Sequence, residues 1–65
     1  MFTLEMSTDN AAFDGDRANE IWNVLYELAS KVSLALTDES IEHAEFPLFD
    51  TNGNRIGTAV YNANA

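Results

Sequence analysis

The chain has no cysteine, few basic residues and no long apolar run. Without cysteine, neither a disulfide framework nor a thiolate metal site is available to stabilise so short a chain. No apolar run approaches the length of a membrane span, and the N-terminus lacks the charged and apolar regions of a signal peptide. We therefore expect a soluble cytoplasmic protein that does not bind membranes.

Basic residues are scarce, and acidic residues dominate the charge. Three Lys and Arg residues stand against eleven Asp and Glu residues, which gives a formal net charge of −8. Direct binding to nucleic acid is disfavoured, because such binding depends on cations that neutralise phosphates. A basic protein surface that normally binds nucleic acid is the partner that this charge suits. The ordinary alternative is that surface carboxylates keep a small protein soluble.

One amphipathic helix is predicted from Asp16 to about Leu36. Its apolar residues recur at the spacing that forms a stripe along a 3.6-residue helix. They are Ala18, Ile21, Trp22, Leu25, Leu28, Ala29, Val32, Ala35 and Leu36. Asp16 is the expected N-cap, since its carboxylate accepts hydrogen bonds from free N–H groups of the first turn. Val24 and Tyr26 lie at the borders of the stripe, where a partner could contact them.

Three strands are predicted around this helix. Residues 2–7 alternate apolar and polar residues, so Phe2, Leu4 and Met6 should face the helix. Two further strands, 45–50 and 55–61, flank a tight primed hairpin turn at 52–53. A Pro at position 47 indicates an edge strand, and a Gly at position 57 indicates a bulge or close packing against the helix.

Together these elements predict one small α+β domain over residues 1–65, with a frayed tail at 62–65. The strand-helix-strand-strand order predicts a three-stranded, mostly antiparallel sheet in the order first, third, second, with the helix on one face. Trp22 and the four Phe residues should supply much of the core. The other sheet face has no cover, so it is either polar and solvated or an interface for a partner or a second copy.

No constellation of catalytic residues is evident. His43 is the only histidine, and Ser40 lies three residues before it, but no orienting carboxylate or oxyanion donor accompanies them. Its neighbours Glu39, Glu42 and Glu45 do not by their spacing define a metal site. The segment 38–45 is either one or two helical turns or an irregular loop. We expect no enzyme activity and no catalytic, cofactor or metal site.

Two short motifs carry a family resemblance. The run 9–13, Asp-Asn-Ala-Ala-Phe, and the run 50–57, Asp-Thr-Asn-Gly-Asn-Arg-Ile-Gly, flank a helix rich in Leu and Ala. This arrangement resembles a group of very short phage and prophage proteins, over most of residues 2–61. The group has no activity that carries over to this chain. The acidic stretch from 38 to 45 is longer than the usual linker of that group.

The resemblance implies a phage or prophage protein that acts inside a bacterial host cell. Small, acidic, cysteine-free phage proteins without catalytic residues look like host-directed inhibitors, including anti-CRISPR proteins that mimic DNA. The expected partner is then a CRISPR effector complex, with a homodimer also possible. The candidate contacts are Asp14, Asp16, Glu20, Glu27, Asp38, Glu39, Glu42 and Glu45. The alternative is a small phage structural or assembly protein that self-associates through the open sheet face.

Overall fold

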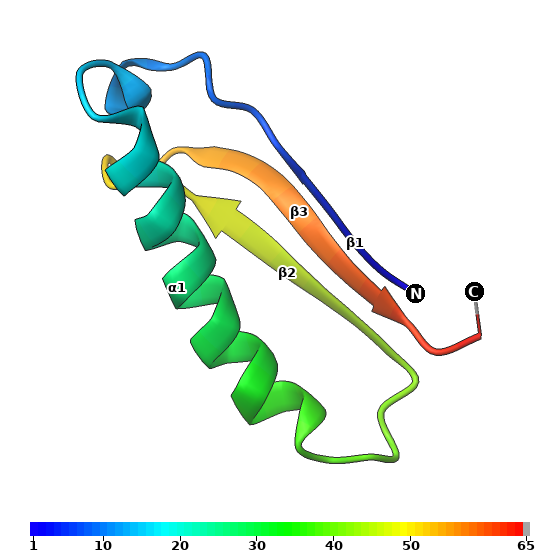
Figure 1. Ribbon diagram of the computed structural model, residues 1–65. Coiled ribbons are helices and arrows are strands. Elements are labelled where there is room, and N and C mark those ends of the chain that lie inside the picture. Colours follow the sequence, from blue (N-terminus) through cyan, green and yellow to red (C-terminus); the bar gives the residue numbers. More distant parts are fainter. Residues whose placement is uncertain (65) are drawn as a thin grey trace.

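The computed structural model describes residues 1–64 of the chain and has an α+β fold (Figure 1). Its elements in chain order are β1 (Phe2–Met6), a 3-10 helix η1 (Ala11–Phe13), α1 (Arg17–Leu36), β2 (His43–Phe49) and β3 (Arg55–Asn62). The sheet has the order β1-β3-β2, and both strand pairs are antiparallel. The predicted strand order and topology are confirmed.

Helix α1 begins where the sequence indicates. Asp16 is the N-cap, and its Oδ1 accepts a hydrogen bond from the backbone N–H of Asn19 at 3.1 Å. At the other end, Thr37 is the C-cap, and its hydroxyl donates to the carbonyl oxygen of Ser33. The buried positions of the helix are Glu20, Val24 and Leu28, which follow one another every four residues along one side.

The sheet register places apolar residues from each of the three strands on the face that α1 occupies. Leu4 of β1 and Phe46 of β2 both pair with Ala59 of the central strand, so the three side chains share a face. A bulge between Leu48 and Phe49 leaves Ile56 without a direct partner in this register. Residues of opposite parity, such as Glu5 and Glu45, lie on the other face.

The β2–β3 hairpin closes through a longer turn than the predicted two-residue one. Gly53 has a φ of +83°, but no residue other than glycine has positive φ within the part of the chain described, which contradicts a primed turn at 52–53. The backbone N–H of Gly53 donates to the carbonyl of Asp50, and the N–H of Asp50 donates to the carbonyl of Asn54, both at 3.0 Å. The Asp50 carboxylate also accepts from the N–H of Asn52, a local bond that favours this wider turn.

The core is thin and lies between α1, η1 and the part of the sheet formed by β2 and β3. Its buried hydrophobic residues are Phe13, Val24, Leu28, Phe46, Leu48, Ile56 and Ala59. Helix α1 packs mainly against β2 and η1, so it covers one side of the sheet face and not the side formed by β1 (Figure 1). The molecule is accordingly elongated, with extents of 41 × 19 × 17 Å.

Several residues expected in the core are exposed instead. Trp22 is 59% exposed, and Phe2 and Phe49 are 43% and 40% exposed, so only two of the four Phe residues are buried. The reason is that the helix lies over β2, which leaves the β1 side of the face and the adjoining side of the helix without a cover. Val24, expected at the border of the stripe, is buried.

The predicted frayed tail at 62–65 is wrong for residues 62–64. Asn62 belongs to β3, the N–H of Ala63 donates to the carbonyl of Glu42 at 2.9 Å, and the N–H of Asn64 donates to the side chain of Asn62 at 3.0 Å. Ala65 lies outside the described residues. No helix among residues 1–64 combines the length and the apolar character needed to cross a bilayer.

Candidate functional site

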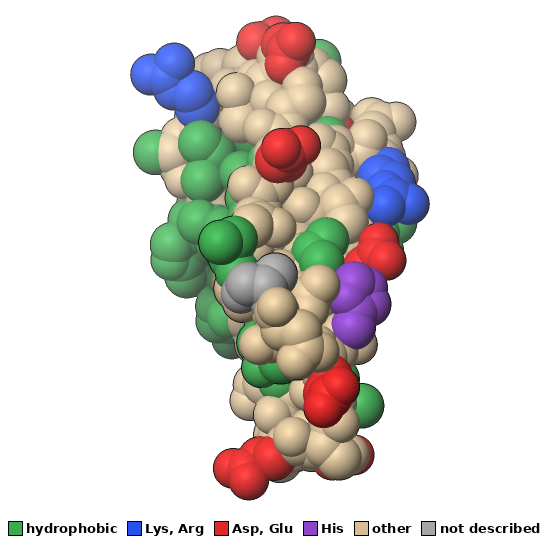
Figure 2. Space-filling view, turned by 90° about the vertical axis from the view of Figure 1, so that its right-hand side faces the viewer, with side chains coloured by type: hydrophobic (Ala, Val, Ile, Leu, Met, Phe, Trp, Pro, Cys, Tyr) green, Lys and Arg blue, Asp and Glu red, His purple; other side chains and the backbone are tan. Residues whose placement is uncertain are grey.

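The candidate acidic residues do not form one patch, because most of them lie near the two ends of the molecule. Asp14 and Asp16 precede the first residue of α1, whereas Asp38, Glu39 and Glu42 lie in the connection between α1 and β2. All five are exposed. In Figure 2, acidic side chains are visible at the upper and lower ends of the molecule.

The segment 38–42, whose conformation the sequence left open, is a turn and loop that leads into β2. The carboxylate of Asp38 accepts hydrogen bonds from the hydroxyl of Ser40 at 2.6 Å and from its backbone N–H at 3.0 Å. These two hydrogen bonds lower the pKa of Asp38 below its ordinary value, and the bond from the hydroxyl has the larger effect. The loop therefore holds its first carboxylate in the charged form.

His43 and Glu45 lie on β2, on the sheet face opposite α1. The Nε2 of His43 is 3.2 Å from the Oε2 of Glu45, and both side chains are more than half exposed. The hydroxyl of Ser40 donates to Asp38 and not to His43, so the two residues do not form a catalytic pair in this structure. Within residues 1–64, no group of three or more His, Cys, Asp or Glu side chains is placed to hold a metal ion.

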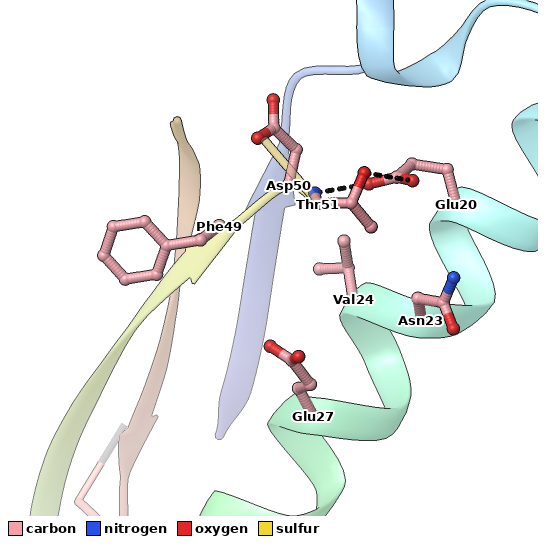
Figure 3. A pocket seen from close by; sticks show the side chains of 7 residues that line it. All are labelled: Glu20, Asn23, Val24, Glu27, Phe49, Asp50 and Thr51. Carbon is pink, nitrogen blue, oxygen red and sulfur yellow. Dashed lines mark hydrogen bonds between the residues drawn. The ribbon is translucent and has the colours of Figure 1, made fainter. Parts of the chain in front are cut away.

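Glu20 is the one candidate contact that the structure removes from the surface. It is 6% exposed, and its carboxylate accepts hydrogen bonds from the backbone N–H of Thr51 at 2.9 Å and from the Thr51 hydroxyl at 3.1 Å (Figure 3). The expectation that Glu20 contacts a partner is therefore wrong. Its role is to tie the hairpin turn to the first turns of α1.

Asp50 is a second buried carboxylate, and it joins the two motifs that carry the family resemblance. Its Oδ2 accepts from the side-chain amide of Asn10 at 2.5 Å, and its Oδ1 accepts from the backbone N–H of Asn54 at 2.9 Å. Asn10 in turn accepts from the N–H of Ala12 and so caps η1. Both motifs thus build one end of the fold.

The hydrogen bonds at Asp50 outweigh its burial. Burial by itself raises the pKa of this carboxyl. The hydrogen bonds that it accepts nevertheless hold the pKa below its ordinary value. The donors are the backbone N–H and side-chain amide of Asn54, the side-chain amide of Asn10 and the backbone N–H of Asn52. Asp50 is thus a charged structural group. Sequence reasoning missed this network, although the Asx-type turn residues at 50–54 were its visible signal.

A small hollow lies beside this network, between α1 and the end of β2 (Figure 3). Its volume is about 20 Å³, enough for one water molecule and too small for a substrate. It is lined by Glu20, Asn23, Val24, Glu27, Phe49, Asp50 and Thr51. Glu27 is exposed at its rim, apart from the carboxylates at the two ends of the molecule.

A larger hollow adjoins the acidic loop at the C-terminal end of α1. It has a volume of about 270 Å³ and combines apolar walls with two carboxylates. Its lining residues are Leu36, Asp38, Glu39, Ile41 and Tyr61. Two of the candidate acidic residues, Asp38 and Glu39, thus stand next to apolar side chains.

The exposed carboxylates are not neutralised by basic neighbours. Of the eleven acidic residues, Glu20 and Asp50 are buried and the other nine are exposed. Among residues 1–64, the one ion pair between side chains joins His43 and Glu45, so no Lys or Arg lies within 4.0 Å of a carboxylate oxygen. The surface carries an almost uncompensated negative charge.

Comparisons with protein-family models, with curated proteins and with solved structures find no match to this chain. The charge, shape and exposed surfaces of the molecule are the features that bear on its function.

Proposed function

We propose that this protein is a non-enzymatic inhibitor that binds a basic, nucleic-acid-binding surface of a host complex. The concrete target is a CRISPR surveillance complex, whose access to DNA the protein would block by mimicking DNA. The supporting observation is the set of nine exposed carboxylates that have no Lys or Arg partner within the described residues 1–64. The phage source that this target requires comes from the resemblance of the motifs at 9–13 and 50–57.

The charge density of the molecule limits the kind of mimicry. A net charge of −8 over a length of 41 Å is roughly one charge per 5 Å, compared with about 1.7 Å for duplex DNA and about 3.4 Å for one strand. The charge per unit length of the protein is thus closer to that of a single strand than to that of a duplex. We expect it to occupy a groove that contacts one strand of the nucleic acid.

The hollow beside the acidic loop supports a basic partner. Lys and Arg side chains have apolar stems and charged heads, and they bind best where both parts find a suitable surface. The hollow offers apolar contact for the stem of such a side chain through Leu36, Ile41 and Tyr61. Its carboxylates, Asp38 and Glu39, lie where they can bind the charged head. Because the Ser40 bonds fix Asp38 in place, little side-chain freedom is lost there on binding.

The test is a competition for DNA binding. A purified CRISPR surveillance complex is mixed with labelled target DNA and increasing amounts of this protein, at low and at moderate salt. We expect the protein to displace DNA, and to do so less effectively as salt screens the charges. Absence of displacement across complexes of different types would refute the proposal.

A matched pair of variants separates local recognition from overall charge. Two double variants, Glu39→Gln with Glu42→Gln and Ala29→Lys with Ser30→Lys, change the net charge by the same amount. The first alters the acidic loop, whereas the second alters exposed positions of α1 that lie at least two turns before it. We expect the loop variant to compete several-fold more weakly and the helix variant to be less affected. Equal losses would mean that no particular acidic surface recognises the partner.

The alternative function, a phage assembly protein that self-associates through the open sheet face, finds less support. The face opposite α1 carries charged or hydroxyl side chains on every strand, including Thr3, Glu5, Glu45 and Thr58. Like charges on two copies would face each other there, which disfavours close packing.

A further inference from the structure

The apolar surface that α1 leaves uncovered lies on the helix side of the sheet. On β1, Phe2 and Leu4 are 43% and 36% exposed, although they share a face with the buried Ala59. On α1, Trp22, Leu25 and Tyr26 are 59%, 42% and 61% exposed. The rings of Trp22 and Tyr26 stack with centroids 5.2 Å apart. We call these five residues the apolar strip.

The helix part of the strip lies on sides of α1 that no strand covers, since Tyr26 follows the buried Val24 by two residues and points away from the sheet. Glu20 bonds Thr51, and the Lys31 ammonium lies 5.9 Å from the centre of the Phe49 ring, so that side of α1 faces the β2 edge. Leu25 follows Glu20 by five residues and therefore points away from this edge, toward the side where β1 is uncovered. Figure 2 shows hydrophobic side chains gathered along the left margin of the molecule.

The exposed apolar area of the strip is comparable to that of the central part of a protein–protein interface. An aromatic side chain buries about 150–250 Å², so the exposed parts of Phe2, Trp22 and Tyr26 amount to roughly 300 Å². The two Leu residues extend this area. Patches of a few hundred Å² mark interaction sites, and a standard interface buries about 800 Å² per partner with a polar rim around such a core.

The shape of the molecule also indicates a missing layer. The radius of gyration is 12.8 Å, whereas a compact chain of this length is expected near 11 Å. No large side chain among the described residues is completely buried. A helix is about 10 Å wide and strands are spaced about 4.8 Å apart, so one helix covers two strands and leaves room for a second helix over β1.

We propose that a second copy of this chain covers the strip, with the α1 of each copy seated over the β1 of the other. One two-fold axis places the Trp22 and Tyr26 ridge of each copy against Phe2 and Leu4 of its partner, so both halves of the strip are buried at once. The strip contains no charged residue, although the chain carries −8, so two copies meet there with the least repulsion. This proposal stands apart from the proposed function, and either can fail alone.

The experiment measures the mass of the protein in solution by analytical ultracentrifugation, from micromolar to millimolar concentration. We expect twice the monomer mass of 7.2 kDa at the upper concentrations, and tighter association at higher salt because salt screens the like charges. Trp22 is the single tryptophan, so its fluorescence emission should shift to the blue as the dimer forms. A monomer mass at every concentration would overturn the proposal and assign the strip to an unlike partner.

Two variants keep the test specific. Trp22→Glu places a charge in the strip without disturbing the buried core, so we expect a monomer with unchanged far-ultraviolet circular dichroism. Leu34→Glu is the matched control, since Leu34 is 84% exposed and lies nine residues after Leu25, on the opposite side of α1. We expect this control to remain dimeric. Equal behaviour of the two variants would contradict the assigned interface.

Discussion

At the scale of single residues, the eleven carboxylates divide into surface groups and two structural groups. Glu20 and Asp50 are buried, and every buried charge needs hydrogen-bond donors to replace lost water. Thr51 supplies both donors to Glu20, while Asn10, Asn52 and Asn54 supply the donors to Asp50. These two carboxylates hold the hairpin turn, η1 and the start of α1 together.

Asp50 makes the stability of the fold depend on pH. Its pKa is lowered in the folded state, so folding is favoured while the carboxyl is charged, and this contribution is lost as the pH falls through the folded pKa. The loss begins near the ordinary value of 3.8, where the unfolded chain takes up its proton. Asp38, whose pKa is also lowered, acts in the same direction.

We therefore expect the free energy of unfolding to decrease below about pH 4. The variant Asp50→Asn should be less stable than the natural sequence at neutral pH and should lose less stability on acidification. Urea unfolding at neutral and acidic pH measures both effects. An unchanged acid dependence in Asp50→Asn would show that other groups account for it.

At the scale of elements, the contact between β1 and β3 depends on the absence of a side chain at one position. A Cβ added to Gly57 would lie 1.9 Å from the carbonyl oxygen of Glu5, which is backbone and unable to move aside. Gly57 pairs with Met6 in β1 and with Leu48 in β2, so its neighbours on both sides are strands. The predicted close packing at this glycine is against β1 and not against the helix.

Gly57→Ala should therefore separate β1 from the sheet and cost about 3 kcal/mol of stability, since overpacking against fixed backbone is not relieved by side-chain motion. Gly53→Ala is the comparison, because Gly53 has open space around it but a φ of +83°. That change should cost about 1–2 kcal/mol. Urea unfolding of both variants gives the two values, and a smaller loss for Gly57→Ala would contradict this account.

At the scale of the whole molecule, the dominant property is uncompensated negative charge on a narrow body. Among residues 1–64, nine exposed carboxylates lie along 41 Å, and no Lys or Arg side chain is paired with any of them. Their mutual repulsion opposes the compact state, and salt reduces this repulsion as the screening length falls from about 10 Å at 0.1 M to about 3 Å at 1 M.

The melting temperature should therefore rise when sodium chloride is increased, in contrast to a protein held together by surface ion pairs. Differential scanning calorimetry at fixed protein concentration measures the shift. The variant Glu39→Gln with Glu42→Gln removes two of the repelling charges and should show a smaller rise. A melting temperature that falls with salt would mean that attractive pairs dominate the surface.

The order of elements and the sheet topology followed from patterns that are local in the chain. Alternation predicted the strands, the 3.6-residue spacing and Asp16 predicted the helix, and the chain direction after one helix led to the order β1-β3-β2. These features depend on side-chain periodicity and capping, which neighbouring residues determine. The acidic character of the surface follows equally from composition alone.

Tertiary structure decided which residues of each pattern are buried. Trp22 and Phe2 carry the same apolar signal as Leu28 and Phe46, yet they are exposed because α1 lies over β2 and one helix is too narrow to cover three strands. In the sequence, Glu20 resembles any other surface carboxylate. In the structure it is bonded by Thr51, which lies 31 residues later in the chain. Such contacts between distant segments depend on how the elements pack, which no local pattern in the chain contains.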